Sequence, residues 1–296
     1  MEKDYRKGLT AAVSCSVIWG FLPIYWKTLL PIPSSAIIFY RIFWVGVVAF
    51  LVSYRKFGWK KIIEPLKDRK NRRTFFLAGV VITTNWSIYI WAVNSGNVIQ
   101  SSIGYYIEPL LISLFGILFF SEKLTKYNFS ALLLATAGVI VMIVHSGQVP
   151  TIAFALAITF ATYSVIKKKL NIESVLSLFY ETLFLVPAAV AVIIFLESTG
   201  RGAFAVAAPY QHILLALTGV CTALPLGLFN SGARFLPLVT LGITQYISPS
   251  IALVLGIFAF KEPFDGIQFM AVTIIWVGLF VFTLGEFARE KERNKN

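Results

Sequence analysis

The chain has 296 residues, of which 57% are hydrophobic and 14% are charged, and its formal net charge is +12. Soluble domains are about 45–50% apolar and about 25% charged, so this composition excludes an ordinary soluble single-core protein. It favours a helical membrane protein, because each membrane span needs about 20 mainly apolar residues.

The apolar runs are separated by charged or Gly- and Pro-rich breaks, and they predict ten membrane-spanning helices. The first five lie near residues 9–28, 35–54, 74–93, 98–119 and 128–145. The second five lie near residues 151–168, 175–196, 211–231, 240–260 and 267–285. The expected fold class is therefore all-α, a polytopic membrane protein.

Basic residues predict how these spans are oriented. With ten spans, 22 of the 26 Lys and Arg residues fall on the side that carries both termini, nine of them between residues 55 and 73. The positive-inside rule then places both termini in the cytoplasm. The same sorting explains the net charge, so we expect no nucleic-acid partner.

The two halves of the chain resemble each other. At an offset of 140 residues, 103–141 aligns with 243–281 without gaps, and twelve of the 39 positions are identical. The identities include Pro109/Pro249, Gly138/Gly278 and Glu122/Glu262, which shared hydropathy alone does not explain. We expect a first five-helix repeat over 8–146, a second over 150–286, and cytoplasmic tails at 1–7 and 287–296.

An odd number of spans in each repeat makes the second repeat enter the membrane from the opposite side. Inverted repeats of this kind are typical of secondary carriers, in which the two halves exchange roles and expose a central site to either side in turn. The repeat therefore predicts transport by alternating access.

Several short motifs resemble a known family. The motif Glu108-Pro109, then Gly116 and 122–125, with its echo at Ser248-Pro249, Gly256 and Glu262-Pro263, resembles the EamA-domain signature. The segments Trp19–Lys27, Tyr40-Arg41, Asn85-Trp86 and Tyr89–Val93 resemble the RarD subgroup of those transporters, although RarD-like chains often carry Asn at the position of Glu108. The resemblance covers nearly the whole chain. It implies the drug/metabolite transporter superfamily, a central cavity and a bacterial inner-membrane location.

Polar residues on spans four and nine are the first candidates for the substrate site. Glu108 lies about ten residues into span four, near mid-bilayer at 1.5 Å per residue, where a carboxyl group normally faces a cavity or a partner. Tyr105 is on the same helix face. The residues at the equivalent positions of the repeat are Gln245 and Ser248. Glu108 is also a candidate for proton coupling; the alternative is a structural ion pair or hydrogen bond.

A second group of candidates would complete an aromatic cavity. Its members are Trp19 and Tyr25 on span one, Asn85, Trp86 and Tyr89 on span three, and Asn230 on span eight. The alternative for the aromatic members is anchoring at the membrane interface or packing, because Trp and Tyr are enriched there.

Charged residues inside other spans are candidates for gating or for contact with substrate charge. Arg41 and Glu181 occupy equivalent repeat positions with opposite sign. The alternative is that a local partner neutralises each of them. Glu122 and Glu262 lie near span ends, where we expect them to cap a helix or to form an ion pair.

The sequence thus predicts a secondary transporter of a small metabolite or drug-like, aromatic or amphipathic compound, with protons as a further partner and the lipid bilayer as its environment. We expect no cofactor, no metal and no catalysis, because the isolated residues His145, His212, Cys15 and Cys221 form no catalytic or metal-binding pattern. Alternatives are an uncoupled facilitator, or a membrane-embedded enzyme or scaffold.

Overall fold

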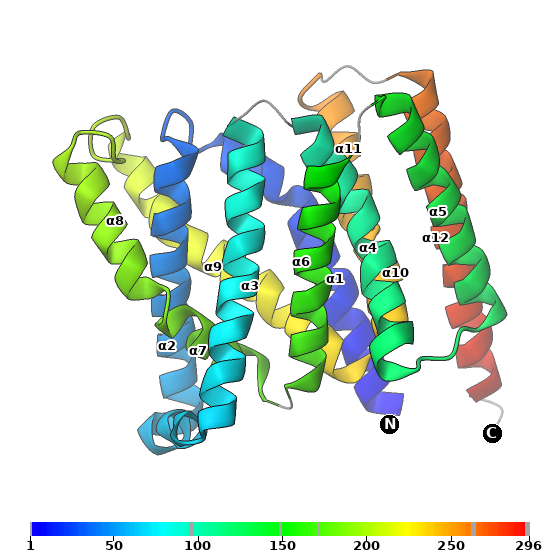
Figure 1. Cartoon of the computed structure of the whole chain (residues 1–296), viewed down its shortest axis with the longest axis horizontal. Coiled ribbons are helices and arrows are strands. Elements are labelled where there is room, and N and C mark those ends of the chain that lie inside the picture. Colours follow the sequence, from blue (N-terminus) through cyan, green and yellow to red (C-terminus); the bar gives the residue numbers. More distant parts are fainter. Residues whose placement is uncertain (1, 95–97, 148–149, 171, 262–264, 294–296) are drawn as a thin grey trace.

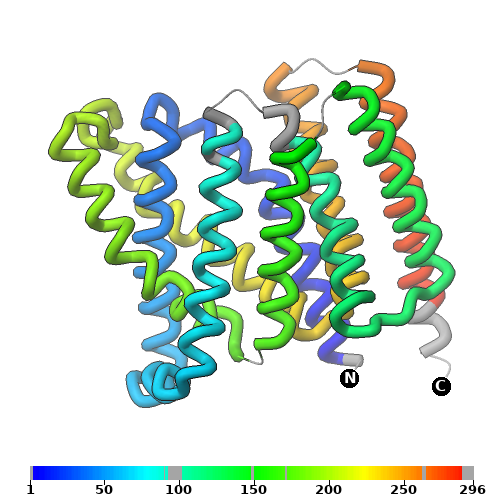
Figure 2. Tube along the Cα trace, viewed as in Figure 1, coloured from blue at the N-terminus to red at the C-terminus, as the bar shows by residue number. Residues whose placement is uncertain are grey.

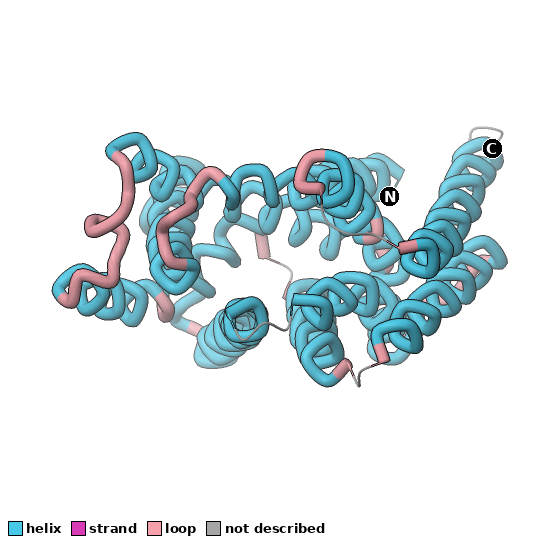
Figure 3. Tube along the Cα trace, turned by 90° about the horizontal axis from the view of Figure 1, so that it is seen from above, coloured by secondary structure: helices cyan, strands magenta, loops and turns pink. Residues whose placement is uncertain are grey.

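The computed structural model describes residues 2–94, 98–147, 150–170, 172–261 and 265–293. Over these ranges the chain is helical, with short connections at the two ends of the helices and no strand (Figure 3). The twelve helices of the described residues are, in chain order, α1 Glu2–Lys27, α2 Ser34–Lys67, α3 Arg69–Asn94, α4 Val98–Phe120, α5 Lys126–Ser146, α6 Thr151–Lys169, α7 Ser174–Leu183, α8 Val186–Ser198, α9 Pro209–Phe235, α10 Leu238–Gln245, α11 Ile247–Phe258 and α12 Gly266–Arg293.

Each of the ten apolar runs corresponds to one helix or to one broken pair of helices. The run at 175–196 is the pair α7 and α8, whose axes differ by 54°. The run at 240–260 is the pair α10 and α11, which are divided at Tyr246. Pro249 lies just beyond this division and has no N–H to donate to the carbonyl of Gln245, which ends α10.

The all-helical membrane architecture is confirmed for the described residues, but the count of ten spans is not. Eight segments of the described chain are long and apolar enough to cross a membrane when α10 and α11 are counted together as one, or nine if the bent pair α7 and α8 also forms one span. Helix α3 is not among them. Four of its first five residues are Lys or Arg, and polar Thr84, Asn85 and Ser87 interrupt its apolar stretch.

Helix α1 begins and helix α12 ends at the same end of the bundle, which we call the terminus end (Figures 1 and 2). Helix α9 runs obliquely behind α3 and α6 and packs against α1 and α2. Helices α5 and α12 pack mainly against each other and form a pair at one edge of the bundle (Figures 1 and 3). Helix α8 lies at the opposite edge of the bundle, against α2 (Figure 1).

Helix α2 bends at the terminus end. Gly58 has φ 71° and ψ 165°, a conformation open to glycine because it has no Cβ atom. The segment that follows, Trp59–Lys67, turns away from the axis of α2 (Figure 1). Its side chains Trp59, Lys60 and Lys61 are exposed, so this end of α2 presents an aromatic ring and two lysines at the surface.

Candidate functional site

A cavity of about 400 Å³ lies at the centre of the bundle, enclosed by α1, α2, α3, α4, α6, α9, α10 and α11. It extends away from the terminus end as far as the connection between α1 and α2, where Leu30 and Ser34 line it. Leu30 is 68% exposed, so the cavity reaches the surface at the end opposite the termini.

The structure brings nine of the twelve candidate residues together around this cavity. They are Trp19, Arg41, Asn85, Trp86, Tyr89, Tyr105, Glu108, Gln245 and Ser248. The other three, Tyr25, Asn230 and Glu181, do not line it. The facing polar residues expected on spans four and nine thus share one cavity, and their contact with a substrate stays a prediction.

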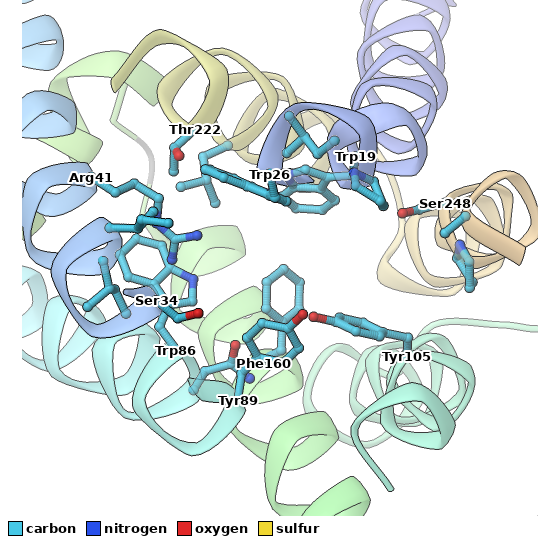
Figure 4. A pocket seen from close by; sticks show the side chains of 18 of the residues that line it. Trp19, Trp26, Ser34, Arg41, Trp86, Tyr89, Tyr105, Phe160, Thr222 and Ser248 are labelled. Atoms are coloured by element: carbon cyan, nitrogen blue, oxygen red, sulfur yellow. The ribbon is translucent and has the colours of Figure 1, made fainter. Parts of the chain in front are cut away.

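Arg41 on α2 lies in the cavity wall between two aromatic rings (Figure 4). Its guanidinium carbon is 4.3 Å from the centroid of the Trp86 ring and 5.7 Å from that of Trp26. Its Nε atom is buried without a hydrogen-bond partner, and no ion pair joins Arg41 to another described residue. Cation–π contacts therefore hold this charge in place of a carboxylate.

Glu108 on α4 is the second charged residue of the wall. No hydrogen bond or ion pair joins its carboxyl group to another residue of the described part of the chain. Tyr105, one turn earlier, points its hydroxyl group toward that of Tyr89 on α3 (Figure 4) and is hydrogen-bonded to it. The two rings are 5.9 Å apart. The carboxyl group is thus left available to the cavity.

Asn85 has a structural contact in addition to its place in the wall. Its Nδ2 donates hydrogen bonds of 2.9 Å to the carbonyl of Leu156 and of 2.9 Å to Oγ1 of Thr159, and so joins α3 to α6. Gln245 and Thr222 differ from it. Both atoms of the Gln245 amide and the Thr222 hydroxyl are buried and have no partner among the described residues.

Tyr25 faces away from the cavity. Its hydroxyl group donates to the carbonyl of Leu214 on α9, and its ring packs edge-on against that of Trp26, with centroids 5.1 Å apart. Of these two neighbours Trp26 is the one that lines the cavity. Tyr25 therefore fixes the end of α1 against α9.

A layer of aromatic rings closes the cavity toward the terminus end. Trp19 of α1 packs on Phe160 of α6 and on Phe229 of α9, with ring centroids 5.9 and 5.6 Å apart. Tyr163, one turn after Phe160, stacks on Phe229 at 6.5 Å and 15°. Tyr163 and Phe229 are fully buried, so this layer separates the cavity from the terminus end.

Glu181 lies beyond the aromatic layer, where a local partner neutralises it. It forms an ion pair with Lys167 of α6, and both side chains are at most 2% exposed. Tyr163 donates to Oε2 of Glu181 at 2.9 Å, and Ser177 donates to Oε1 at 2.9 Å. The Tyr163 hydroxyl group is also 3.5 Å from Oδ1 of Asn230, which is buried here as well.

Glu122 caps a helix, as expected of a residue at a span end. Its two carboxylate oxygens accept hydrogen bonds of 2.7 and 2.9 Å from the backbone N–H groups of Leu238 and Val239, at the first turn of α10. Lys168 lies 3.3 Å from the same carboxylate. Glu262, the residue equivalent to Glu122 in the second repeat, lies outside the described residues.

The cavity has further lining residues that the sequence analysis missed: Leu22, Pro23, Trp26, Leu30, Ile32, Ser34, Ile37, Ile38, Phe160, Thr222, Leu226, Pro249 and Ala252. Helical spacing carries a signal for some of them. Trp26 follows Trp19 by two turns, and Ile37 and Ser34 precede Arg41 by one and two turns, so each shares a helix face with a residue that was identified. Phe160 and Thr222 have no such signal.

The fold and the cavity define the class: a helical membrane protein that encloses a central cavity. The EamA-like transporter family matches the chain over residues 6–144 and again over 150–284. The Bacillus subtilis protein "Uncharacterized transporter YojE" is 37% identical, over 96% of this chain and 95% of its own length. Two proteins named "Protein RarD" are also similar. The Streptomyces exfoliatus protein is 35% identical over 95% and 90% of the two chains, and the Escherichia coli protein is 29% identical over 99% of both.

One solved structure, titled only "Crystal structure of protein", has the same fold with a TM-score of 0.71 and 16% identity, over 94% of this chain and 97% of its own. The chain belongs to the EamA-like transporter family, within its RarD subgroup, and is a membrane transporter.

Proposed function

We propose that the protein is an alternating-access carrier that moves a small aromatic or amphipathic compound across the bacterial inner membrane without changing it chemically. The observation that carries this proposal is the shape of the central cavity. It is open toward one end of the bundle and closed toward the other by Trp19, Phe160 and Phe229. A volume of about 400 Å³ falls in the range of about 300–1,000 Å³ that is usual for small-molecule sites.

The arrangement of the helices supports two inverted repeats of five spans each. In this count α3 is one span, the pair α7 and α8 is one span, and the pair α10 and α11 is one span. Helices α1 and α9 pack together, and so do their equivalents at the repeat offset, α6 and α3. The pairs α4–α6 and α1–α11 are related in the same way. Tyr246 donates a hydrogen bond to the carbonyl of Tyr106 at 3.1 Å, which places the equivalent tyrosines of the two halves in direct contact.

Basic residues support cytoplasmic termini, as argued from the positive-inside rule. In that orientation the cavity faces the outside, and the aromatic layer with the Lys167–Glu181 pair closes the cytoplasmic side. Transport then requires that this layer separates while the opposite end closes, with the halves exchanging conformations.

Glu108 is the residue that we assign to proton coupling. It is one of the two charged residues in the described cavity wall, and its carboxyl group has no partner that would fix its charge. Such a group takes up a proton when the cavity faces one side and releases it to the other. Export of the cargo driven by proton entry is the direction that we propose.

Accessibility labelling tests the carrier cycle without knowledge of the cargo. Both native cysteines, Cys15 and Cys221, are replaced by Ser, and Ser248 in the cavity is replaced by Cys. A membrane-impermeant maleimide is then added to oriented vesicles from either side. We expect labelling from both faces, because the site alternates. Labelling from one face only, in intact vesicles of both orientations, would contradict the proposal.

Proton coupling is tested in proteoliposomes with a cargo found by ligand-stabilisation screening, since a ligand that binds the folded state raises its apparent stability. Flux in the wild-type protein should depend on the pH gradient, and Glu108→Gln should lose that dependence. Glu64→Gln is the matched control, because Glu64 is exposed and outside the cavity. If flux through Glu108→Gln still depends on the pH gradient, the coupling role is wrong. If flux through the wild-type protein is independent of the pH gradient, the protein is a facilitator.

A further inference from the structure

Arg41 is a partly buried cation that has no counter-ion among the described residues. Among the described residues, the cavity wall contains one other charged side chain, Glu108, and no ion pair joins the two. Ionised side chains in a membrane protein interior are normally paired or hydrogen-bonded, because desolvating an unpaired charge is costly. The faces of Trp86 and Trp26 satisfy part of this need, yet they leave the N–H groups of the guanidinium without acceptors.

Unpaired polar atoms gather around the same cavity. Seven buried side-chain atoms of the described residues have no partner. Four of them belong to cavity-lining residues, namely Nε of Arg41, Oγ1 of Thr222 and both atoms of the Gln245 amide, and the other three, in Ser53, Asn230 and Thr240, lie elsewhere. Thr222 and Gln245 are 5% and 3% exposed. Most buried polar groups in proteins have partners, so a group of partnerless atoms around one cavity indicates that a bound molecule supplies them.

Figure 4 shows how these groups are distributed. Arg41, Thr222 and Ser34 lie at one side of the cavity, and Tyr105 and Ser248 lie at the other. Trp19 and Phe160 lie between the two sides. The cavity thus has a cationic end, an aromatic middle, and a second polar end with hydroxyl groups.

We propose that the cargo is an organic monoanion, a carboxylate carried on a flat aromatic ring, and that Arg41 binds the carboxylate. This inference rests on the proposed function, in which the cargo occupies this cavity. The planar guanidinium matches a carboxylate through two parallel N–H···O hydrogen bonds, and Thr222 supplies a further donor. The ring of the cargo packs in the aromatic middle, and its carboxylate pairs with Arg41, the one cation among the described residues of the wall.

A purely structural role for Arg41 makes a different prediction. If the guanidinium only joins α2 to α3 through Trp86, then its removal destabilises the protein but does not change the relative affinity for charged and neutral ligands. The ratio of the affinities for an acid and for its isosteric amide therefore separates the two roles. It can be measured in the wild-type protein without any substitution.

The probes are 2-naphthylacetate, its neutral amide 2-naphthylacetamide, and 2-naphthylethylamine, measured with detergent-purified protein by calorimetry and by the shift in melting temperature. A hydrogen-bonded charge pair in a buried site corresponds to about a tenfold or greater difference in affinity. We expect the acid to bind at least about tenfold more tightly than the amide, and the amine to bind most weakly.

Arg41→Gln should remove the preference for the acid and leave the affinity for the amide within about twofold of wild type. Arg41→Lys should retain part of the preference, because a lysine keeps the charge but loses the planar fork. Arg201→Gln is the matched control, since Arg201 is exposed at the same end of the bundle and outside the cavity. Thr222→Val, which keeps the side-chain shape, should weaken binding of the acid but not binding of the amide.

The inference is overturned if the wild-type protein does not bind the acid more tightly than the amide. It is also overturned if Arg41→Gln keeps the preference for the acid. If Arg41→Gln does not fold, the wild-type ratio and Thr222→Val decide. Binding in detergent is independent of the carrier cycle. The two proposals can therefore fail separately. If the acid binds through Arg41 but the Ser248→Cys variant is labelled from one side only, the carrier proposal is wrong and the anion site stands. If Ser248→Cys is labelled from both sides but the acid is not preferred, the anion site is wrong and the carrier proposal stands.

Discussion

Gly138 on α5 and Gly278 on α12 hold reciprocal positions where these two helices pack together. A Cβ atom on Gly138 would lie 2.6 Å from the carbonyl oxygen of Ala271, and one on Gly278 would lie 2.9 Å from that of Ala131. The same offset of 140 residues relates the two glycines and the two alanines. Each half of the chain thus presents to the other the same small surface, which lets the two backbones approach closely.

Substitution of either glycine by alanine should therefore separate α5 from α12. We expect Gly138→Ala and Gly278→Ala each to destabilise the protein by about 1–3 kcal/mol, as is usual when a packed contact is overfilled. Melting temperature in detergent measures the effect. Gly266→Ala is the control, because a Cβ atom at that position meets nothing within 4 Å; equal melting temperatures for all three variants would contradict the close contact.

The buried pair Lys167–Glu181 should behave as a unit. Removing one partner leaves the other charge buried, which costs about 3–5 kcal/mol, whereas replacing both by apolar residues of similar size costs far less. Lys167→Met and Glu181→Leu should thus each lower the melting temperature strongly, and the double variant should recover part of the loss. Additive losses would show that the two side chains do not interact.

The surface pair Lys56–Glu173, in which Lys56 is exposed and Glu173 is partly buried, gives a prediction with a definite pH dependence. Burial by itself raises the pKa of Glu173, but the hydrogen bonds from Lys56 and from the backbone N–H groups of Val175 and Leu176 outweigh it, so the pKa is lower than usual. The unfolded-state pKa of Glu is about 4.3. The stabilisation by Glu173 is therefore complete above that pH and is lost as the pH falls through the lower, folded-state pKa.

Glu173→Gln should accordingly lower the melting temperature by the same amount from pH 5 to pH 8, and the difference from wild type should shrink below about pH 4.3. The pair lies at the surface with Glu173 only partly buried, and Glu173 is the N-cap of α7, so we expect a modest loss of about 1 kcal/mol. Lys56→Gln, which removes the ion pair but leaves the cap, should lose less. A difference that grows as the pH falls would contradict the assigned sign.

Glu122 should stabilise the start of α10 through its two backbone hydrogen bonds. Glu122→Ala removes a carboxylate from a helix N-terminus, where it satisfies free N–H groups and interacts favourably with the helix dipole, so we expect a loss of about 1–2 kcal/mol. Lys168→Met keeps both hydrogen bonds and should lose less. Melting temperatures that are equal for Glu122→Ala and wild type would show that Leu238 and Val239 do not need this cap.

Periodicity and hydropathy predicted where the helices lie, since each expected run corresponds to a helix or a broken pair. The breaks within two of these runs were missed. The bend between α7 and α8 occurs at Phe184 and Leu185, just before Pro187. Pro187 has no N–H to donate to the carbonyl of the last residue of α7, and it is the local signal that was overlooked. Val186, at the start of α8, also packs against Gly46 of α2. A local sequence pattern does not report a contact between residues so far apart in the chain.

The cavity was predicted best where a polar residue stands in an apolar helix. Glu108, Gln245 and Arg41 were identified in this way, because lipid does not solvate such groups. The same reasoning placed Glu181 beside them, although it lies beyond the aromatic layer with Lys167. Glu181 is held away from the cavity by its ion pair with Lys167. In the sequence Lys167 is one of three consecutive lysines at a span end, a pattern that predicts an exposed basic end and not an inward-facing partner.

The bend of α2 at Gly58 restricts how that helix can move. Trp59 is a residue that favours the headgroup layer, and the neighbouring lysines are costly to draw into hydrocarbon. A shift of α2 along its own axis would carry this segment either into the bilayer core or away from the surface. Such a shift is therefore opposed in both directions, and tilting about the bend remains the less costly displacement for the helix that carries Arg41.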